Sequence, residues 1–386
     1  MIIRTKEQEI LRYLRYFPAA GIVGPRQCGK STLAHLLVKK KTGSVYLDLE
    51  NPDDRVKLTN PSLYFAEHKN KLICLDEVQF MPEIFAVLRG VIDRNKKNGQ
   101  FLLLGSASPN LLKQSSETLA GRISYVELSP FSLTELIQNK KPDFQKVWIR
   151  GGFPRSYLAP TKDISMVWRK NFIRTFLEQD LSNLGIGIAP ENMRKFWMMC
   201  AHLHGQMLNL SGLGHSLGVS HTTIRNYIDV MTGTFMIRKL EPYYSNIDKR
   251  LKKTPKIYLS DSGILHALLN INSLDDLLAH PVAEFSWEGF VLSQLVDSLK
   301  GWEFYYAATA DQAEIDFILK KGRHLIAVES KLSKAPNVTR GFYNLLNDLK
   351  IKKAFVVCPI EDSFPLAKNT TAIGISELIK KLNSIK

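Results

Sequence analysis

The sequence predicts an α/β fold that opens with a parallel sheet and ends with a second α/β region. Short apolar segments at residues 19–23, 44–49, 72–75 and 101–104 have the length and composition of strands, and helical patterns lie between them. Strands that alternate with helices favour a parallel sheet with both faces covered. The length of 386 residues predicts two or three domains, each able to bury its own core.

The remaining elements are predicted from the pattern of apolar side chains along the chain. Residues 7–16 and 31–40 carry apolar side chains at helical spacing and flank the first strand. The strand signal fades after Phe131, and residues 133–204 are mostly helical. Strands and helices mix a second time from Ile257 to the C-terminus.

The composition is that of a globular, basic protein. Hydrophobic residues make up 45% of the chain and charged residues 23%, which excludes a globally disordered chain. The formal net charge of +15 favours polyanionic partners such as nucleic acid, anionic lipid or nucleotides. Basic proteins are also common for reasons of solubility, so the charge alone leaves a nucleic-acid partner open.

We predict neither a membrane span nor a secretory signal. No apolar run approaches the roughly 20 residues that cross a bilayer. Charged side chains interrupt residues 1–17, where a secretory signal needs an unbroken apolar centre. The cysteines Cys28, Cys74, Cys200 and Cys358 share no metal-ligand spacing. We therefore expect no disulfide framework and no cysteine zinc site, which fits a reducing, cytoplasmic location.

A glycine-rich loop joins the first strand to the next helix. Its sequence over residues 24–31 matches G-x-x-x-x-G-K-[ST]. The glycines allow a tight curl in which successive N–H groups point at phosphate oxygens, and the helix adds its positive N-terminal end. Lys30 would reach the β- and γ-phosphates, and the Ser31 hydroxyl would ligate Mg²⁺. The predicted nucleotide-binding residues are Gly24, Pro25, Arg26, Gln27, Cys28, Gly29, Lys30, Ser31 and Thr32.

An acidic pair follows another buried strand. Four apolar residues, 72–75, lead directly to Asp76 and Glu77. The carboxyl ends of parallel strands form the ligand-binding edge of an α/β sheet, so both carboxylates should face the loop. Asp76 would hold Mg²⁺, and Glu77 would orient and deprotonate the attacking water as a general base.

Two further residues are candidates for the same reaction. Ser106 follows the strand at residues 101–104 and either senses the γ-phosphate, positions the water, or is a plain loop serine. Arg122 lies beyond a further helix and either enters a neighbouring subunit's site as an arginine finger or is an exposed structural arginine. The first interpretation of Arg122 would require a homo-oligomer.

These segments, GPRQCGKST, LICLDE, LLLGSAS and LAGRI, together resemble the AAA+ superfamily. They are most similar to prokaryotic AAA ATPases with a C-terminal domain of unknown function, in which a Gly-Gly-x-Pro segment follows, here at residues 151–154. The resemblance covers nearly all of the chain. It implies ATP as the nucleotide and Mg²⁺ as the cofactor, and the chain has no Asn-Lys-x-Asp motif for guanine. Cys28 departs from the usual loop sequence, and its thiol would make the ATPase sensitive to oxidation.

The segment at residues 210–231 has a helix-turn-helix pattern. Ser211 and Ser220 can cap two short helices, and Gly218 lies in the turn between them. Residues 236–244 would then form a wing hairpin. A DNA-binding interpretation places His221, Thr222, Thr223, Arg225 and Asn226 in a major groove and Lys249–Lys253 on phosphates. The alternative is a packing module without DNA contact, since Arg225 is the one cation among these groove-facing candidates.

The C-terminal third carries a second acidic constellation. Glu329 and Lys331 are two residues apart on a predicted strand and therefore share a face. Asp316 adjoins the preceding strand, and Glu288 lies on a predicted helix. This set resembles the PD-(D/E)XK nuclease fold, which implies Mg²⁺ on Asp316 and Glu329, a catalytic role for Lys331, and a further metal contact from Glu288. The alternative is a fold relative with idle or repurposed residues that acts as a binding module.

We thus expect four domains and one leading function. The domains are an AAA+ P-loop core (1–135), a helical lid (136–205), a winged helix-turn-helix (206–256) and an α/β nuclease-like domain (257–386). The leading function is a Mg²⁺-dependent ATPase that couples ATP and ADP states to DNA binding or to the nuclease-like domain. Two alternatives are a DNA endonuclease switched by ATP, and a nucleotide-gated DNA-binding regulator with negligible turnover.

Overall fold

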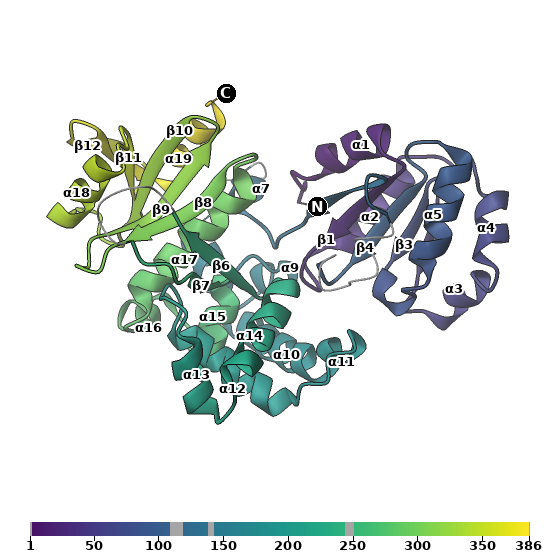
Figure 1. The fold of residues 1–386 in the computed structure, drawn as a ribbon, viewed down its shortest axis with the longest axis horizontal. Coiled ribbons are helices and arrows are strands. Elements are labelled where there is room, and N and C mark those ends of the chain that lie inside the picture. Colours follow the sequence, from purple (N-terminus) through teal and green to yellow (C-terminus); the bar gives the residue numbers. More distant parts are fainter. Residues whose placement is uncertain (1, 109–118, 138–142, 244–250, 386) are drawn as a thin grey trace. The chain divides into compact units, whose positions relative to one another are not determined.

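A computed structural model describes residues 2–108, 119–137, 143–243 and 251–385 (Figure 1). The chain forms two compact units, and each is assembled from segments that are separate in the sequence. The first unit comprises Met1–Phe131, Thr175–Ile188 and Asp229–Met236, and the second comprises Ser132–Arg174, Ala189–Ile228 and Ile237–Lys386. The four-domain division stays a prediction, and part of its helical lid, Thr175–Ile188, groups with the first unit.

The first unit is built on a parallel sheet, as the sequence predicts. The described strands lie in the order β2-β3-β4-β1-β5, and every neighbouring pair is parallel. The strands are β1 (Ala19–Val23), β2 (Val45–Asp48), β3 (Ile73–Asp76), β4 (Phe101–Gly105) and β5 (Ile123–Glu127).

Helices cover both faces of this sheet. Alternate strand side chains, among them Leu75 and Leu103, pack with α4 and α5 in one core cluster. The intervening positions face the side on which α1 and α2 contact the strands. The helices of this unit are α1 (Glu7–Tyr16), α2 (Lys30–Lys39), α3 (Pro52–Lys57), α4 (Pro61–Glu67), the 3₁₀ helix η1 (Val78–Phe80), α5 (Ile84–Asn95), the π-helix η2 (Phe176–Asp180) and α11 (Leu181–Asn183).

The strand register brings three loops to one edge of the sheet. Val23 at the end of β1 pairs with Gly105 at the end of β4. Leu75, next to the end of β3, pairs with Leu103 of β4. Because β4 lies between β1 and β3, the segments that follow these three strands leave the sheet side by side.

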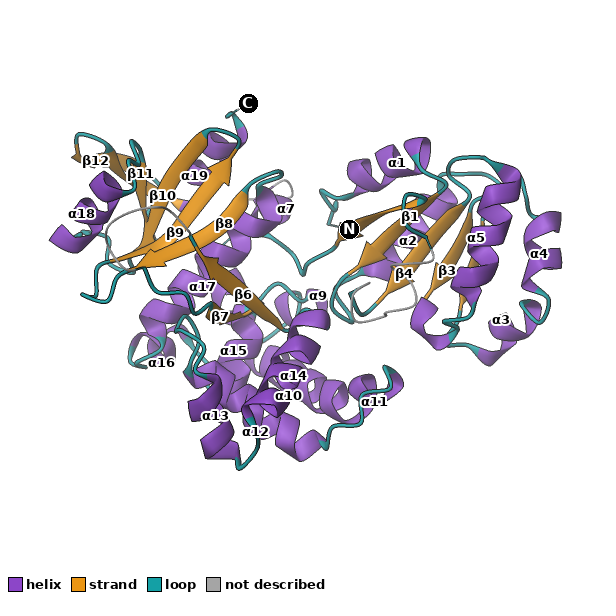
Figure 2. Ribbon diagram, in the orientation of Figure 1, coloured by secondary structure: helices purple, strands orange, loops and turns teal. Residues whose placement is uncertain are grey.

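The second unit contains a larger mixed sheet (Figure 2). The described strands lie in the order β12-β13-β11-β10-β9-β8-β6-β7, with antiparallel pairs around β9 and parallel pairing between β10 and β11. The strands are β6 (Ile237–Pro242), β7 (Lys256–Leu259), β8 (Glu303–Ala308), β9 (Glu314–Lys321), β10 (His324–Ser330), β11 (Ala354–Cys358), β12 (Ser363–Ala367) and β13 (Thr370–Gly374).

Helices pack on this sheet and against one another. Phe342 and Leu345 of α18 join the core cluster that includes Ile315 and Ile318 of β9. The helices that begin in this unit are α7 (Leu133–Ile137), α8 (Phe144–Arg150), α9 (Pro154–Tyr157), α10 (Lys162–Thr175), α12 (Pro190–His202), α13 (Leu210–Leu217), α14 (His221–Gly233), α15 (Ser262–Leu268), α16 (Leu274–Leu278), α17 (Ala283–Ser298), α18 (Arg340–Asp348) and α19 (Ile375–Asn383). No helix in the described ranges is both long enough and apolar enough to cross a bilayer.

The helix-turn-helix segment forms two helices, but the first is capped by Asn209, which accepts a hydrogen bond from the Gly212 N–H at 2.9 Å, and not by the predicted Ser211, which lies inside the helix. Gly218, at φ +67°, ends α13, and Ser220 accepts a hydrogen bond from the Thr223 N–H at the start of α14. The hairpin predicted within residues 236–244 is not seen in the described part of that range: residues 237–242 form the single strand β6, which pairs antiparallel with β7. The assignment as a winged helix stays a prediction, and Tyr244, Lys249 and Arg250 lie outside the described residues.

The Gly-Gly-x-Pro segment connects two helices of the second unit. Gly151 has a φ of +74°, and a Cβ added there would lie 2.1 Å from the Asp261 carboxylate. The Gly152 N–H donates to the other Asp261 oxygen at 2.8 Å, and the Ile264 N–H donates to the same carboxylate at 3.0 Å. Buried Asp261 therefore joins the end of α8 to the start of α15, and the position requires glycine.

Candidate functional site

The glycine-rich loop has the backbone that its sequence predicts. Gly24 has a φ of +153°, and a Cβ added there would lie 2.2 Å from the Leu128 carbonyl oxygen. Gly29, at φ +101°, precedes α2 and gives that helix no side-chain cap. The first N–H groups of α2 therefore lack a side-chain partner at the cap, which is the arrangement that helix N-termini use to bind phosphate.

Lys30 lies buried under the loop. Its side chain is 4% exposed, and its Nζ donates to the carbonyl oxygens of Gly24 and Pro25 at 3.0 Å each. The predicted phosphate-binding ammonium is thus held within reach of the loop by two neutral acceptors. A phosphate is a stronger, charged acceptor for this ammonium than a carbonyl oxygen.

Cys28 does not fit the predicted sensitivity to oxidation. The residue is fully buried, its Sγ donates to the Leu128 carbonyl oxygen at 3.1 Å, and burial raises the pKa of its thiol. The reactive species is the exposed thiolate, which this environment disfavours. The thiol instead helps to anchor the loop to the segment after β5.

Asp76 and Ser31 meet at the edge of the sheet. Asp76 is 2% exposed, and the hydroxyls of Ser31 and Tyr46 form hydrogen bonds with its carboxylate. Burial raises the pKa of Asp76, and these two hydrogen bonds oppose the shift. A hydroxyl and a carboxylate in contact fit the oxygen ligands that Mg²⁺ prefers, so Ser31 and Asp76 would hold the ion. The contribution of Tyr46 was not predicted from the sequence.

Glu77 and Ser106 also converge, from β3 and β4. The Ser106 hydroxyl donates to a Glu77 carboxylate oxygen at 2.6 Å, and the Gln79 amide donates to the same oxygen. Glu77 has a φ of +53°, a left-handed conformation that is uncommon for a residue with a side chain. Such a backbone costs of order 1–3 kcal/mol and persists where the surroundings enforce it, often at functional sites.

Arg122 binds within its own unit. Its Nε and Nη2 donate to the two carboxylate oxygens of Asp93 at 2.6 and 3.0 Å. Asp93 lies on α5, so this bidentate pair ties the start of β5 to that helix. An arginine-finger role would have to break this pair.

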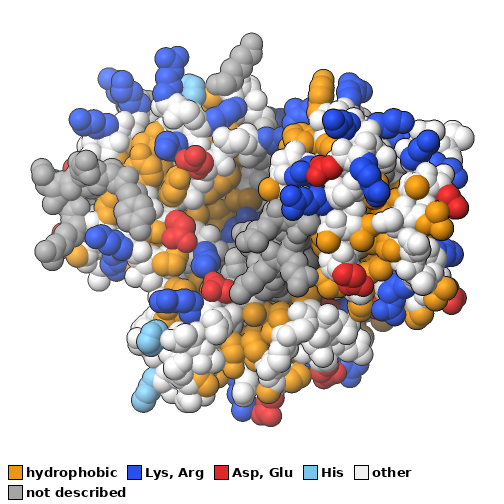
Figure 3. Space-filling view, turned by 45° about the vertical axis from the view of Figure 1, so that its right-hand side comes forward, with side chains coloured by type: hydrophobic (Ala, Val, Ile, Leu, Met, Phe, Trp, Pro, Cys, Tyr) orange, Lys and Arg blue, Asp and Glu red, His pale blue; other side chains and the backbone are white. Residues whose placement is uncertain are grey.

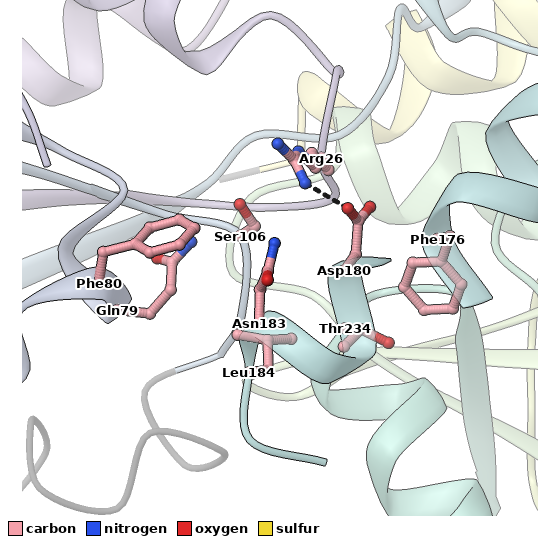
Figure 4. A pocket seen from close by; sticks show the side chains of 9 residues that line it. All are labelled: Arg26, Gln79, Phe80, Ser106, Phe176, Asp180, Asn183, Leu184 and Thr234. Atoms are coloured by element: carbon pink, nitrogen blue, oxygen red, sulfur yellow. Dashed lines mark hydrogen bonds and ion pairs between the residues drawn. The ribbon is translucent and has the colours of Figure 1, made fainter. Parts of the chain in front are cut away.

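Arg26 makes the contact that the sequence does not predict. Its guanidinium donates through Nη1 to Asp180, on the π-helix η2, and through Nη2 to Glu50 at 3.1 Å. Figure 4 shows Arg26 and Asp180 facing each other across a small pocket of the first unit. The other residues that line the pocket are Gln79, Phe80, Ser106, Phe176, Asn183, Leu184 and Thr234.

The second unit brings the nuclease-like residues together. Asp316 on β9 accepts hydrogen bonds from the Ser330 N–H and hydroxyl at 2.8 Å each. On β10 and just beyond it, Glu329 and Lys331 form an ion pair of 2.9 Å. The Asp316 N–H donates to Glu329 at 3.4 Å, so the three predicted residues are neighbours.

Glu288 is held by a lysine that the sequence analysis missed. Lys256 of β7 is 3% exposed and pairs with Glu288 at 2.9 Å and with Glu314 at 2.5 Å. The Tyr258 hydroxyl also donates to Glu288. Burial raises the pKa of Glu288 to about 7 and that of Glu329 to about 8. Lys256 lies just before the predicted nuclease-like domain (257–386), and no sequence spacing links it to Asp316.

Mg²⁺ on Asp316 and Glu329 stays a prediction, because in this structure these carboxylates already have partners within the protein. Glu288 and Glu329 each bind a lysine, and Asp316 accepts two hydrogen bonds from Ser330. Within the described ranges, no group of three or more His, Cys, Asp or Glu side chains converges as metal ligands would. The cluster is an ion-pair network that is balanced by its own lysines.

The helix-turn-helix leaves its predicted groove-facing residues on the surface. His221, Thr222, Arg225 and Asn226 are exposed, whereas Ile224 is buried. On the face shown in Figure 3, Lys and Arg side chains form several separate groups rather than one continuous stripe. This distribution by itself does not mark a nucleic-acid track.

Comparison with protein families divides the chain into three matched regions. An AAA domain family matches residues 16–137. Two families described as domains of unknown function, DUF8612 and DUF4143, match residues 141–275 and 283–378.

Curated relatives cover most of the chain. An uncharacterized protein of Mycobacterium tuberculosis is 38% identical over 376 residues, which is 97% of this chain and 84% of the relative. An uncharacterized protein of Mycobacterium bovis has the same identity and the same coverage. An uncharacterized protein of Haemophilus influenzae is 21% identical over 295 residues, covering 71% of this chain and 68% of its own length.

Solved structures resemble the chain more distantly. A Walker-type ATPase of Pyrococcus abyssi has a TM-score of 0.47 and 13% identity, covering 70% of this chain and 96% of its own. DnaA of Aquifex aeolicus, bound to AMPPCP, has a TM-score of 0.31 and 15% identity, covering 60% of this chain and 89% of its own.

Proposed function

We propose that this chain, which belongs to the family of its mycobacterial relatives, is an AAA-family ATPase. From that membership we propose that it hydrolyses ATP with Mg²⁺ at the edge of the first sheet, and that the nucleotide state is coupled to the second unit.

One observation carries this proposal. The segments after β1, β3 and β4 bring Ser31 to Asp76 and Ser106 to Glu77. ATP hydrolysis at a phosphate loop requires residues that hold a cation, here Ser31 and Asp76, and residues that orient water, here Ser106 and Glu77. The four residues come from three segments that are far apart in the sequence, so their convergence supports a single nucleotide site.

In the proposed mechanism, each residue of the site acts on phosphate or water. The loop amides and Lys30 bind the phosphate oxygens, with Lys30 exchanging its two carbonyl acceptors for phosphate. Mg²⁺ held by Ser31 and Asp76 supplies positive charge that offsets the phosphates. Glu77 accepts the proton of the attacking water, and Ser106 orients the Glu77 carboxylate.

A Mg²⁺-ATPase assay on wild type and Glu77→Gln tests the mechanism. General-base catalysis contributes about 10²–10⁴-fold, so turnover of the variant should fall by that factor while it still binds ATP. The assay is run with and without DNA, because coupling to DNA would change the wild-type rate. A Glu77→Gln turnover equal to wild type would show that Glu77 is not the base.

A DNA-directed role of the second unit is the second candidate function. It is favoured by the juxtaposition of Asp316, Glu329 and Lys331 and by the exposed polar face of α14. The contact between Glu329 and Lys331 is compatible with DNA binding and with Mg²⁺-dependent cleavage, so both remain part of this candidate. In this candidate, ATP and ADP states would differ in DNA affinity.

Cleavage and binding are separated by incubating DNA with the protein and Mg²⁺. Loss of cleavage in Asp316→Ala would support a nuclease. If wild type leaves DNA intact in every nucleotide state, the nuclease is excluded. Binding that changes between ATP and ADP, with negligible turnover, would instead support the nucleotide-gated regulator.

A further inference from the structure

The segment Thr175–Ile188 has an unusual place in the chain. It packs with the first unit, while the residues on both sides of it, up to Arg174 and from Ala189, belong to the second unit. It includes the π-helix η2, an irregularity that is rare and is found frequently at functional sites. The segment is therefore joined covalently to the second unit at both of its ends.

A buried carboxylate attaches the segment to the phosphate loop. Asp180, the last residue of η2, is 7% exposed and forms an ion pair with Arg26 of the loop. Burial raises the pKa of Asp180, and Arg26 is the leading influence that opposes this shift. A buried carboxylate that loses its cation is strongly disfavoured, so the attachment depends on Arg26.

Arg26 also lies beside the residues that are proposed to act on the terminal phosphate. It lines the same pocket as Ser106, the residue that holds the Glu77 carboxylate, and the negative charge of Glu77 acts on its guanidinium. Figure 4 shows Arg26 and Asp180 facing each other, with Ser106 and Asn183 beside them. A phosphate in the loop would place further negative charge near Arg26 and, through the pocket, near Asp180.

We propose that Asp180 is a positioning residue that makes the site respond to ATP: the γ-phosphate competes with Asp180 for Arg26 and loosens the attachment of Thr175–Ile188. The inference rests on the proposed ATP site. ADP lacks the γ-phosphate and therefore leaves the Arg26–Asp180 ion pair in place. Binding of the γ-phosphate to Arg26 and the Arg26–Asp180 ion pair oppose each other. By linkage, removing Asp180 strengthens ATP binding by the same factor by which ATP weakens the attachment of Thr175–Ile188.

Hydrogen exchange of the full-length chain tests this directly. Wild type is compared without nucleotide, with ADP and with a non-hydrolysable ATP analogue, each with Mg²⁺. The analogue should protect amides of residues 24–32 and accelerate exchange in Thr175–Ile188 by about 5–150-fold, the usual range of coupling between two sites. ADP should protect the loop without accelerating the segment.

Three variants make the test specific to the carboxylate. In Asp180→Asn the segment should exchange at the same rate with either nucleotide, and affinity for the ATP analogue should rise relative to ADP. Asp180→Glu keeps the charge and should restore the nucleotide-dependent difference. Glu178→Gln, which removes an exposed carboxylate from the same π-helix, should behave as wild type.

The outcomes distinguish this inference from the proposed function. If the analogue does not protect residues 24–32 of wild type, ATP binding itself fails, and both are overturned. If the loop is protected but exchange in Thr175–Ile188 is unchanged, the inference alone is overturned, and this arm needs no variant. The inference is equally overturned if Asp180→Asn folds and keeps the wild-type preference between ATP analogue and ADP.

Discussion

Ser106 shows how a single hydroxyl shapes the proposed reaction. It donates to Glu77 at 2.6 Å, and Glu77 is held in a left-handed backbone conformation next to the buried Asp76. The Ser106 contact is made to the residue that would act on water, not to the loop that would bind phosphate. Its loss should therefore affect the rate of reaction more than the binding of ATP.

We expect Ser106→Ala to lower kcat by about 10-fold and to change KM for ATP less than about 2-fold. The physical reason is that a carboxylate orienter acts mainly in the transition state. Steady-state kinetics at saturating Mg²⁺ measure both constants, with Ser44→Ala, an exposed hydroxyl on the same unit, as the control. A rise in KM at constant kcat would place Ser106 in nucleotide binding instead.

Glu329 should make the stability of the second unit depend on pH. Burial raises its pKa from 4.5 to about 8 in the folded chain, so between these values the folded state binds more protons than the unfolded state. Stability from this group is then complete below about pH 4.5 and is lost as the pH rises through 8. The ion pair with Lys331 moderates the effect without changing its sign.

The second unit should therefore become less stable as the pH rises from 6 to about 8, and Glu329→Gln should reduce that loss. All five tryptophans, Trp148, Trp168, Trp197, Trp287 and Trp302, belong to the second unit, so tryptophan fluorescence reports on it selectively. Urea midpoints followed by this signal at several pH values give the measurement. A midpoint that rises with pH in wild type would contradict the assigned direction.

At the scale of elements, the central strands β1, β3 and β4 of the first unit were predicted closely because each of their residues is buried. The apolar segment at residues 19–23 is β1, and residues 101–104 form all but the last position of β4. Strand β5 was missed. It lies at the sheet edge, and its residues are mostly partly exposed, so its sequence lacks the apolar run of a central strand.

The candidate site was predicted only where local sequence determines it. Loop, acidic pair and Ser106 each follow an apolar strand, and parallel pairing then brings them together. Asp180 and Lys256 come from distant segments with no periodic or spacing signal, and only tertiary packing places them beside Arg26 and Glu288. Their roles could not be read from the sequence for that reason.

Gly151 gives a prediction about an element junction. Gly151→Ala adds both backbone strain at φ +74° and a clash with Asp261, whereas Gly301→Ala adds the strain alone, at φ +73° with nothing within 4 Å. We expect Gly301→Ala to cost about 1 kcal/mol and Gly151→Ala roughly 1–3 kcal/mol more. Urea unfolding followed by tryptophan fluorescence measures both. Equal costs would show that the packing of Gly151 against Asp261 is not needed.

At the scale of the whole molecule, the net charge of +15 and the exposed face of α14 favour a polyanion such as DNA. If DNA binds there, Arg225→Ala should weaken binding and reduce the slope of log affinity against log salt by about 1, since one phosphate contact is lost. Fluorescence anisotropy at several salt concentrations measures the slope, and Arg55→Ala on the first unit is the control. An unchanged slope in Arg225→Ala would exclude a phosphate contact by Arg225.

The central claim concerns the first unit: the loop at residues 24–32 binds the phosphates of ATP, with Ser31 and Asp76 holding Mg²⁺. Isothermal titration calorimetry of wild type and Lys30→Ala with ATP and Mg²⁺ tests it most directly, after circular dichroism shows that both are folded. We predict binding to wild type and at least about 10-fold weaker binding to Lys30→Ala, since a charge-assisted contact to phosphate is lost. Folded wild type that gives no binding heat at any temperature tried, or a Lys30→Ala affinity equal to that of wild type, would contradict the claim.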